Sequence, residues 1–153
     1  MDYRADSATR FGEYTGERVN GKMHGFGTMV WPNGMRYEGT FLYDGIYGEG
    51  TFYYPDGAVY DGWWRDDLKC GRGVYTWPNG DQYEGMFADD LRNGKGVMTC
   101  ANGASYDGVF SNDTLNGYAE SKSIHGWIYN GEFRNWLRWG HGDLIYGDCR
   151  HYV

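Results

Sequence analysis

A repeat of 23 residues runs through almost the whole of this 153-residue chain. Seven tyrosines recur at that spacing, from Tyr14 to Tyr152, and each of the first six is followed two residues later by a glycine. Three further glycine columns, which begin at Gly25, Gly27 and Gly34, keep the same period. A fixed period of about 20 to 50 residues is the signature of solenoids and other repeat arrays. The chain is therefore predicted to be an array of about six similar units.

Each unit has the pattern of a β-hairpin. In residues 37–41 aromatic or glycine positions alternate with polar ones, and residues 48–54 alternate again, which is the period of a strand. We expect residues 42–47 to connect the two strands, and Pro-Asp-Gly at 55–57 to turn the chain into the next unit. No helical period extends over a comparable length. The expected fold class is an all-β, single-layer antiparallel β-sheet solenoid of about six hairpin repeats.

The residues also carry a resemblance to a known family. The pattern Tyr-x-Gly-x-Phe/Trp, then Gly-x-Gly and then Asn/Asp-Gly, resembles the MORN repeat (membrane occupation and recognition nexus). It is clearest in residues 37–41, 83–87 and 24–27. The resemblance spans about residues 12 to 152, which is nearly the whole chain.

On this basis the chain divides into an N-terminal lead-in, residues 1–11, and a repeat array, residues 12–153. The units start near Tyr14, Tyr37, Tyr60, Tyr83, Tyr106 and Tyr129. Three departures from the pattern occur. Arg18 replaces the aromatic residue of the first unit, Ala119 replaces a glycine of the fifth, and Glu-Ser-Lys-Ser at 120–123 replaces an apolar run.

The aromatic residues of the array are expected to gather on one face of the sheet. Glycine opposite an aromatic residue lets the ring lie flat over the backbone, so that rings stack along the array. Two interpretations remain open: the stack is purely a scaffold, or it lines a groove that receives a helix or an extended peptide of a partner. The aromatic candidates are Tyr37, Phe41, Tyr60, Trp64, Tyr83, Phe87, Tyr106 and Phe110.

The opposite face is expected to carry a row of carboxylates, one for each of four successive units. Such a row is either a solvated stripe or a docking surface for a basic partner. Apolar residues are expected beside it, and an exposed patch of that kind often marks association. The candidate partner-binding residues of this face are Glu38, Asp61, Glu84, Asp107, Trp63, Met86 and Val109.

Residues 133–140 form an aromatic and basic segment that we expect to be a connecting loop. Trp and Arg are enriched at interface hot spots, so Trp136, Arg138 and Trp139 are further partner-binding candidates. The alternative is local packing that caps the last hairpin. A sheet of this kind also has two open edges, which must be capped or paired. Because a seventh unit begins at Tyr152 and stops, the C-terminal edge is the expected place for a homodimer or for end-to-end association.

Charge and composition exclude several classes of function. The formal net charge is −7, and the acidic excess lies before residue 120, so nucleic acid is excluded as a partner and anionic lipid is not favoured. No apolar stretch is long enough to span a membrane. The three cysteines show no CxxC spacing, which indicates unpaired thiols in a reducing compartment. No motif of an enzyme, a metal site or a cofactor site is present, so none of these is expected.

The function follows mainly from the resemblance. It implies a non-enzymatic structural scaffold or adaptor of a cytoskeletal or ciliary assembly, axonemal and similar to parts of radial spokes, with protein subunits of that assembly as partners. It also implies a cytoplasmic location at the cytoskeleton or cilium. Two alternatives remain open. One is a membrane-apposed module that binds or tethers lipid, as the family name implies. The other is a regulatory module for an enzyme partner, because similar arrays precede kinase and lysine methyltransferase domains.

Overall fold

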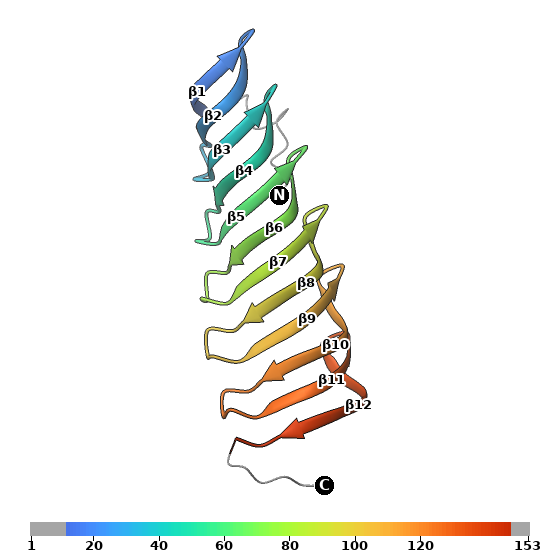
Figure 1. The fold of residues 1–153 in the computed structure, drawn as a ribbon. Helices are drawn as coiled ribbons and strands as arrows, with labels where there is room; N and C mark the ends of the chain where they lie inside the picture. The colour runs from blue at the N-terminus through green and yellow to red at the C-terminus, as the bar shows by residue number, and fades with distance from the viewer. Residues whose placement is uncertain (1–11, 148–153) are drawn as a thin grey trace.

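The computed structural model describes residues 12–147, which form one antiparallel sheet of twelve strands in sequence order. The strands are β1 (Glu13–Val19), β2 (Lys22–Val30), β3 (Arg36–Leu42), β4 (Gly45–Tyr53), β5 (Val59–Arg65), β6 (Leu68–Thr76), β7 (Gln82–Ala88), β8 (Leu91–Thr99), β9 (Ser105–Ser111), β10 (Thr114–Lys122), β11 (Ile128–Arg134) and β12 (Leu137–Ile145). Figure 1 shows the six hairpins stacked along one long axis, with β1 and β12 at opposite ends. The all-β, single-sheet fold class is confirmed, and the described range contains no helix.

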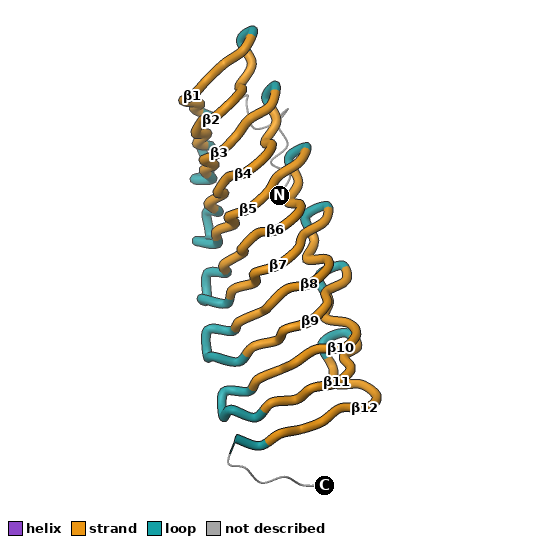
Figure 2. Tube along the Cα trace, in the orientation of Figure 1, coloured by secondary structure: helices purple, strands orange, loops and turns teal. Residues whose placement is uncertain are grey.

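Two kinds of connection alternate along the sheet. Each hairpin closes through two residues at positive φ, such as Tyr43 (46°) and Asp44 (77°), as in type I′ turns. The expectation that residues 42–47 form this connection is wrong, because both strands extend up to these two residues. Successive hairpins are joined by longer loops, in one of which the Trp31 N–H donates to the Met35 carbonyl at 2.9 Å. Figure 2 shows the short turns along one long edge and the longer loops along the other.

A row of small residues, which we call the glycine row, crosses the sheet at the middle of the strands. Its members are Gly16, Gly27, Gly39, Gly50, Gly62, Gly73, Gly85, Gly96, Gly108, Ala119, Gly131 and Gly142. The ring of Tyr37 lies over Gly39 and Gly50, so closely that a Cβ on either glycine would approach it within 3.0 Å. Real Cβ atoms essentially never come that close. The packing of glycine against an aromatic ring, expected from the sequence, is therefore confirmed.

The rings form a continuous stack on one face of the sheet, which we call the aromatic ladder. Tyr37 contacts Phe41 of its own hairpin edge-on, with ring centroids 5.2 Å apart, and Trp64 of the next hairpin at 5.8 Å. Tyr60 repeats the arrangement with Trp64 and Phe87, at 5.0 Å each. Edge-to-face pairs at these distances are favourable. Because these rings cover one another, a sheet of one layer acquires a core on its aromatic face.

In the second to fifth hairpins an aspartate at the second turn position joins the hairpin to the preceding one. Asp67 accepts a hydrogen bond from the Ile46 N–H at 2.7 Å, and its own N–H donates to the Ile46 carbonyl at 3.2 Å. Asp44, Asp90 and Asp113 bind the hairpins before them in the same two ways. These bonds join the tips of neighbouring hairpins and explain why aspartate recurs at this turn position.

The fifth hairpin, β9 and β10, has the same strands but packs differently. Ala119 occupies the glycine-row position over which the tyrosine ring lies in the other units. Tyr106 is accordingly only half-buried, and its ring packs edge-on against Trp136, 5.5 Å away. The polar residues 120–122 still belong to β10, so this departure from the repeat pattern leaves the hairpin intact.

Candidate functional site

The aromatic ladder buries most of the residues that the sequence assigned to a groove or scaffold. Seven of these residues are at most 5% exposed, namely Tyr37, Phe41, Tyr60, Trp64, Tyr83, Phe87 and Phe110. Tyr106 is half-buried. Three further rings of this face, which were not among the candidates, are also partly accessible. Tyr54, Tyr75 and Trp77 are half-buried near the longer loops, with centroids 5.8 Å apart for the first two and 4.7 Å for the last two.

Beside these accessible rings the aromatic face has a hollow of about 250 Å³. We call it the cation hollow, because Lys69 of β6 and Arg92 of β8 lie in it. Its lining consists of Lys69, Tyr75, Trp77, Phe87, Asp90, Arg92 and Asp113. Sequence reasoning missed both cations. A comparison of equivalent repeat positions could have found them. At the position of Lys69 and Arg92, the first, second and fifth units carry the apolar residues Met23, Ile46 and Leu115.

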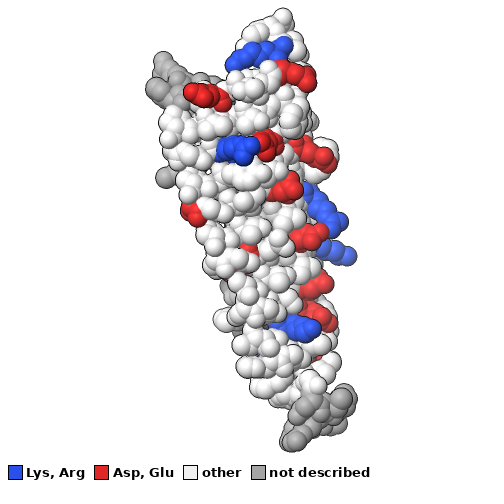
Figure 3. Space-filling view, turned by 90° about the vertical axis from the view of Figure 1, so that its left-hand side faces the viewer, with Lys and Arg blue, Asp and Glu red and all other residues white. Residues whose placement is uncertain are grey.

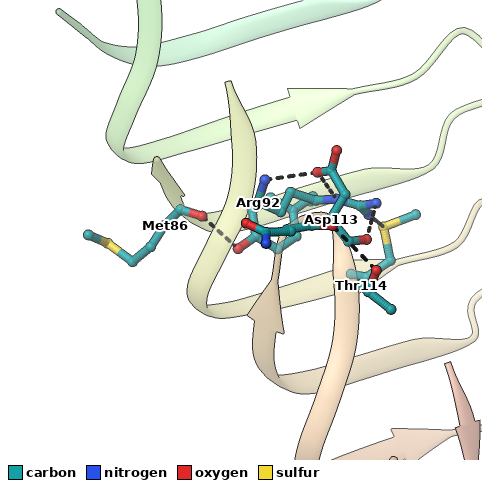
Figure 4. Close-up of polar contacts among 7 residues, drawn as sticks. Met86, Arg92, Asp113 and Thr114 are labelled. Atoms are coloured by element: carbon teal, nitrogen blue, oxygen red, sulfur yellow. Dashed lines mark hydrogen bonds and ion pairs between the residues drawn. The ribbon is translucent and has the colours of Figure 1, made fainter. Parts of the chain in front are cut away.

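The Arg92 guanidinium is held by Asp113 and by aromatic rings. Its Nε donates to Asp113 Oδ1 at 3.1 Å, and its Nη2 donates to the Asp113 carbonyl at 2.8 Å. Its Nη1 faces Met98 Sδ, a weak acceptor, at 3.9 Å. The Cζ atom lies 5.4 Å from the Trp77 ring and 5.5 Å from the Trp136 ring. Figure 4 shows the guanidinium alongside Asp113.

Lys69 occupies the equivalent position one hairpin earlier and is similarly enclosed. Its Nζ lies 3.2 Å from Asp90 Oδ1, and only 11% of its side chain is exposed. The rings of Tyr60, Trp64 and Tyr75 surround the ammonium group at 5.7 to 6.0 Å. Ring faces attract a cation that has lost part of its water, and the adjacent carboxylate compensates its charge. The hollow therefore holds two compensated cations against flat aromatic surfaces.

On the opposite face the expected carboxylates form a row, but most of them have partners within the chain. The four are Glu38, Asp61, Glu84 and Asp107. Arg36 pairs with Glu38 and Arg72 pairs with Glu84, while the Thr51 hydroxyl donates to Asp61 at 3.0 Å. Figure 3 shows acidic and basic side chains following one another along one side of the molecule. The row is thus of mixed charge, and its role in docking stays a prediction.

The apolar candidates of this face are well exposed. Trp63 is 47% exposed, Met86 41% and Val109 44%, and each lies across the sheet from a charged residue of the neighbouring strand. Two shallow hollows of about 480 Å³ and 330 Å³ lie between these side chains, and Arg72 lines both. This face therefore presents apolar and charged groups in alternation, and its binding role also stays a prediction.

The C-terminal candidates lie on a hairpin, whereas a connecting loop was expected over residues 133–140. That expectation is wrong because Asn135 and Trp136 take positive φ, 49° and 67°, and so form a two-residue turn between β11 and β12. Trp136 packs back onto the aromatic face, with its ring 5.5 Å from that of Phe110. It fills the space beside the fifth hairpin.

The other two C-terminal candidates lie on the outermost strand of the described range, β12. Trp139 is 57% exposed, and the Arg134 guanidinium lies 5.3 Å from its ring. Arg138 covers the ring of Tyr129 at 4.5 Å. Leu137 is 70% exposed beside them. An exposed edge strand with such side chains can pair with another chain, which remains a prediction, and Tyr152 lies outside the described residues.

Groups suited to metal or nucleophilic chemistry are scarce in residues 12–147. No cluster of three His, Cys, Asp or Glu side chains in that range could hold a metal ion. Cys70 and Cys100 are unpaired, and burial raises the pKa of both thiols, which disfavours the nucleophilic thiolate. Cys149 lies outside the described range. None of the described elements is a helix long and apolar enough to cross a membrane.

Comparison with known families matches the repeats directly. Residues 14–36, 37–59, 60–82, 83–105 and 129–148 each match the MORN repeat. The chain belongs to the MORN-repeat family. The unmatched interval coincides with the fifth hairpin, where Ala119 and the displaced Tyr106 depart from the pattern. No curated protein matches the chain.

Solved structures also match the chain, and the first of the following two has a similar fold. One is the TCP domain of Drosophila melanogaster SAS-4 (dCPAP) in complex with a proline-rich motif of Ana2 (dSTIL). It has 14% sequence identity and a TM-score of 0.53, over 88% of this chain and 77% of that one. The other is the TCP10 domain of Danio rerio CPAP in complex with a STIL peptide. It has 17% identity and a TM-score of 0.30, over 77% of this chain and 64% of that one. MORN repeats are a non-catalytic family, compatible with a protein-binding scaffold.

Proposed function

We propose that this MORN-repeat chain is a non-enzymatic structural scaffold or adaptor of a cytoskeletal or ciliary assembly, axonemal and similar to part of a radial spoke. It binds protein partners through its aromatic face, its charged face and its open sheet edges. The observation that carries the proposal is the single-layer sheet of twelve strands. Equivalent side chains recur about every 9.4 to 9.8 Å along it, since each hairpin adds two strand spacings.

The chemistry of the described residues also supports a binding role. The side chains of Trp63, Met86 and Val109 are exposed and apolar, and they alternate with charged groups on a face that none of the twelve described strands covers. The solved neighbour, the SAS-4 domain, is itself in a complex with a peptide of a partner protein. A cytoplasmic location at the cytoskeleton or cilium is part of the same proposal.

Fractionation of cells that carry a tagged full-length chain tests the proposal. We expect the protein to stay with the detergent-insoluble cytoskeleton or axoneme and to leave it in high salt, since salt screens interactions between exposed charges. Release with membranes and flotation with liposomes would instead favour the membrane-apposed alternative. Recovery in complex with an active enzyme, without cytoskeletal retention, would favour the regulatory alternative.

A pair of matched variants tests the carboxylate row within this experiment. Asp61 and Asp107 form no ion pair with an arginine of residues 12–147, so Asp61→Asn with Asp107→Asn removes charge without releasing any of those cations. The control is Asp66→Asn with Asp89→Asn, at exposed turn positions where Asn112 stands in the equivalent place of the fifth hairpin. If the row docks a basic partner, the first pair lowers the salt needed for extraction and the control does not. Equal behaviour of the two pairs contradicts a docking role for the row.

A further inference from the structure

The strand position that Lys69 and Arg92 occupy is apolar in three hairpins and cationic in the other three. Met23, Ile46 and Leu115 are buried there against the aromatic ladder, and the third cation, Arg138, lies exposed on the last strand. Lys69 and Arg92 instead place enclosed charges in two neighbouring units, although burial of a charge is costly unless it is compensated. Departures from apolar packing of this kind occur at functional sites.

The two cations of the hollow keep hydrogen-bond donors that the chain does not fully use. Asp90 Oδ1 accepts both the Lys69 N–H and the Lys69 ammonium, and Asp113 Oδ1 accepts both the N–H and the Nε–H of Arg92. The Oδ1 atom of each carboxylate is thus occupied by donors of the chain itself. Donor capacity remains, because an ammonium group has about three N–H bonds and Arg92 Nη1 faces only a sulfur at 3.9 Å. The hollow therefore suits a ligand that supplies acceptors.

A proline-rich backbone has this chemistry. Proline has a carbonyl acceptor and no N–H donor, and the polyproline II helix leaves its carbonyl groups free of internal hydrogen bonds. An α-helix uses its own carbonyl groups internally. The electron-rich carbonyl oxygens also complement the two cations, while the rings of Tyr75 and Trp77 offer the flat apolar surfaces on which proline rings pack.

The repeat distance selects the same conformation. Lys69 and Arg92 are equivalent residues of adjacent hairpins, so they stand about 9.4 to 9.8 Å apart along the array. One turn of polyproline II has three residues and advances about 9.3 Å. An extended β-strand repeats every two residues, or about 6.6 to 6.8 Å, and does not match. Two carbonyl groups three residues apart in polyproline II point in the same direction, so one could face Lys69 and the other Arg92.

We propose that the cation hollow binds a proline-rich segment of a partner protein in the polyproline II conformation, laid across the third to fifth hairpins along the array. Two of its carbonyl groups, three residues apart, accept hydrogen bonds from Lys69 Nζ and Arg92 Nη1, and its proline rings pack on Tyr75 and Trp77. This site rests on the proposed scaffold function and names the kind of partner segment that the aromatic face takes.

Calorimetric titration of the full chain tests the site. The probe is a capped, uncharged peptide of about twelve residues with proline at every third position, which is about four turns of polyproline II. We expect it to bind, and we expect Lys69→Met with Arg92→Leu to weaken binding about a hundredfold, since each lost charge-assisted bond is worth about tenfold. Lys122→Met, at an exposed position of β10 outside the hollow, is the control and should leave binding unchanged.

Two further measurements keep the proposal falsifiable. Trp77→Ser keeps both cations, carries the residue found at the equivalent position 123, and should weaken binding about tenfold through the lost ring surface. A peptide of the same composition with proline at every fourth position should bind at least about tenfold more weakly, since its carbonyl groups lose register with the hairpins. Equal binding of the two peptides, or unchanged binding by folded Lys69→Met/Arg92→Leu protein, overturns the proposal.

Other occupants give other results. Tighter binding of an acidic peptide without proline, with an affinity that falls steeply as salt is added, would overturn the proposal in favour of an anion site.

The experiments distinguish an error in the proposed binding site from an error in the proposed scaffold function. If the proline-rich peptide does not bind but the tagged protein stays on the cytoskeleton, the hollow is wrong and the scaffold function stands. If cytoskeletal retention fails as well, the function itself is contradicted.

Discussion

The fourth and fifth hairpins have strands of equal length and the same turn geometry, yet their tyrosines differ. Tyr83 lies over the glycine row and is fully buried, whereas Tyr106 is half-buried and turned toward Trp136. The structural difference at the row is one methyl group, because Ala119 stands where the fourth hairpin has Gly96. The comparison teaches that the hairpin itself tolerates the substitution, while the packing of the aromatic ladder does not.

The same boundary changes how hairpins are joined. Asp113 ties the fifth hairpin to the fourth through the Arg92 N–H at 2.8 Å. At the next junction Trp136 takes the aspartate position. Its N–H still donates to the Leu115 carbonyl at 3.2 Å, but the side-chain acceptor is now Asn116 Oδ1, which accepts the Asn135 N–H at 3.1 Å. The array is therefore most regular through its second to fourth units and changes character at the fifth.

The largest expected effect is a loss of folding stability at high pH, where the buried tyrosines would ionise on unfolding. Burial raises the pKa of Tyr37 and Tyr60, and raises that of Tyr83 to about 12, from an ordinary value of 10.0. Above pH 10 the unfolded chain therefore binds fewer protons than the folded chain, so stability falls as pH rises toward the folded-state pKa values. Three such groups lower the free energy of unfolding by at most about 4 kcal/mol in total between about pH 9 and about pH 11. Thermal unfolding followed from about pH 9 to about pH 11 measures this loss.

Phenolate absorbance provides the check on that explanation. The tyrosines of the regular units should ionise only together with unfolding, giving a steep step in absorbance that coincides with the loss of β-sheet circular dichroism. A gradual rise in phenolate absorbance while the sheet remains folded would show that the ladder does not exclude water.

The next largest effect is expected from placing the alanine of the fifth hairpin at the equivalent position of the fourth. Gly96→Ala brings a Cβ against the Tyr83 ring and should lower the free energy of unfolding by about 3 kcal/mol, since overpacking a filled site displaces the ring. Chemical denaturation measures the change. The control is Gly45→Ala, where the new Cβ would lie at an ordinary 3.5 Å from the Leu42 carbonyl oxygen. Equal losses for the two variants would contradict the ring-over-glycine explanation.

Removing one aspartate from the regular region has a smaller effect. Asp67→Ala deletes the acceptor for the Ile46 N–H and should cost about 2 kcal/mol, because a charge-assisted hydrogen bond is lost and the turn residue keeps positive φ. Asp67→Asn keeps an acceptor at the same place and tolerates that backbone conformation. It should lose less than half as much in the same denaturation experiment. If both variants lose equally, the charge rather than the hydrogen bond joins the hairpins.

The smallest effect is expected from the reverse substitution in the fifth hairpin. Ala119→Gly opens the space over the glycine row, so Tyr106 should move onto it and become less accessible. The free energy of unfolding should change by less than about 1 kcal/mol, since the gain in packing opposes the entropy cost of glycine. Nitration of Tyr106, followed by mass spectrometry, should slow. An unchanged nitration rate would show that Trp136, rather than Ala119, holds Tyr106 in place.

Local signals in the sequence were enough for the strands but not for every turn. Alternation within residues 37–41 and 48–54 predicted two strands, and both are present. The turn between them was missed because Tyr43 and Asp44 are not the Asn-Gly pair that marks a type I′ turn. A tyrosine at positive φ is uncommon, and here the hydrogen bonds of Asp44 to the preceding hairpin help to hold it.

The candidate site was harder to predict than the fold. The sequence placed Tyr37 and Tyr60 on the aromatic face, but only packing shows that neighbouring rings cover them completely. Lys69 and Arg92 were missed because a charged residue in a strand ordinarily faces water. Their aromatic surroundings and their carboxylate partners come from four different hairpins, and no local sequence window contains them together.

By itself, the 23-residue period of tyrosine and glycine determined that this protein is an array of hairpins with aromatic residues on one face. Strand period and turn chemistry are local, so a single sequence carries them. Only the tertiary structure shows which rings are buried and which stay accessible. It also shows that Tyr106 does not lie over the glycine row, where Ala119 stands. It also decided that two cations share one hollow. These features depend on close packing between residues that are about one repeat or more apart in the chain. In such packing a single methyl group or charge changes the position of a neighbouring side chain.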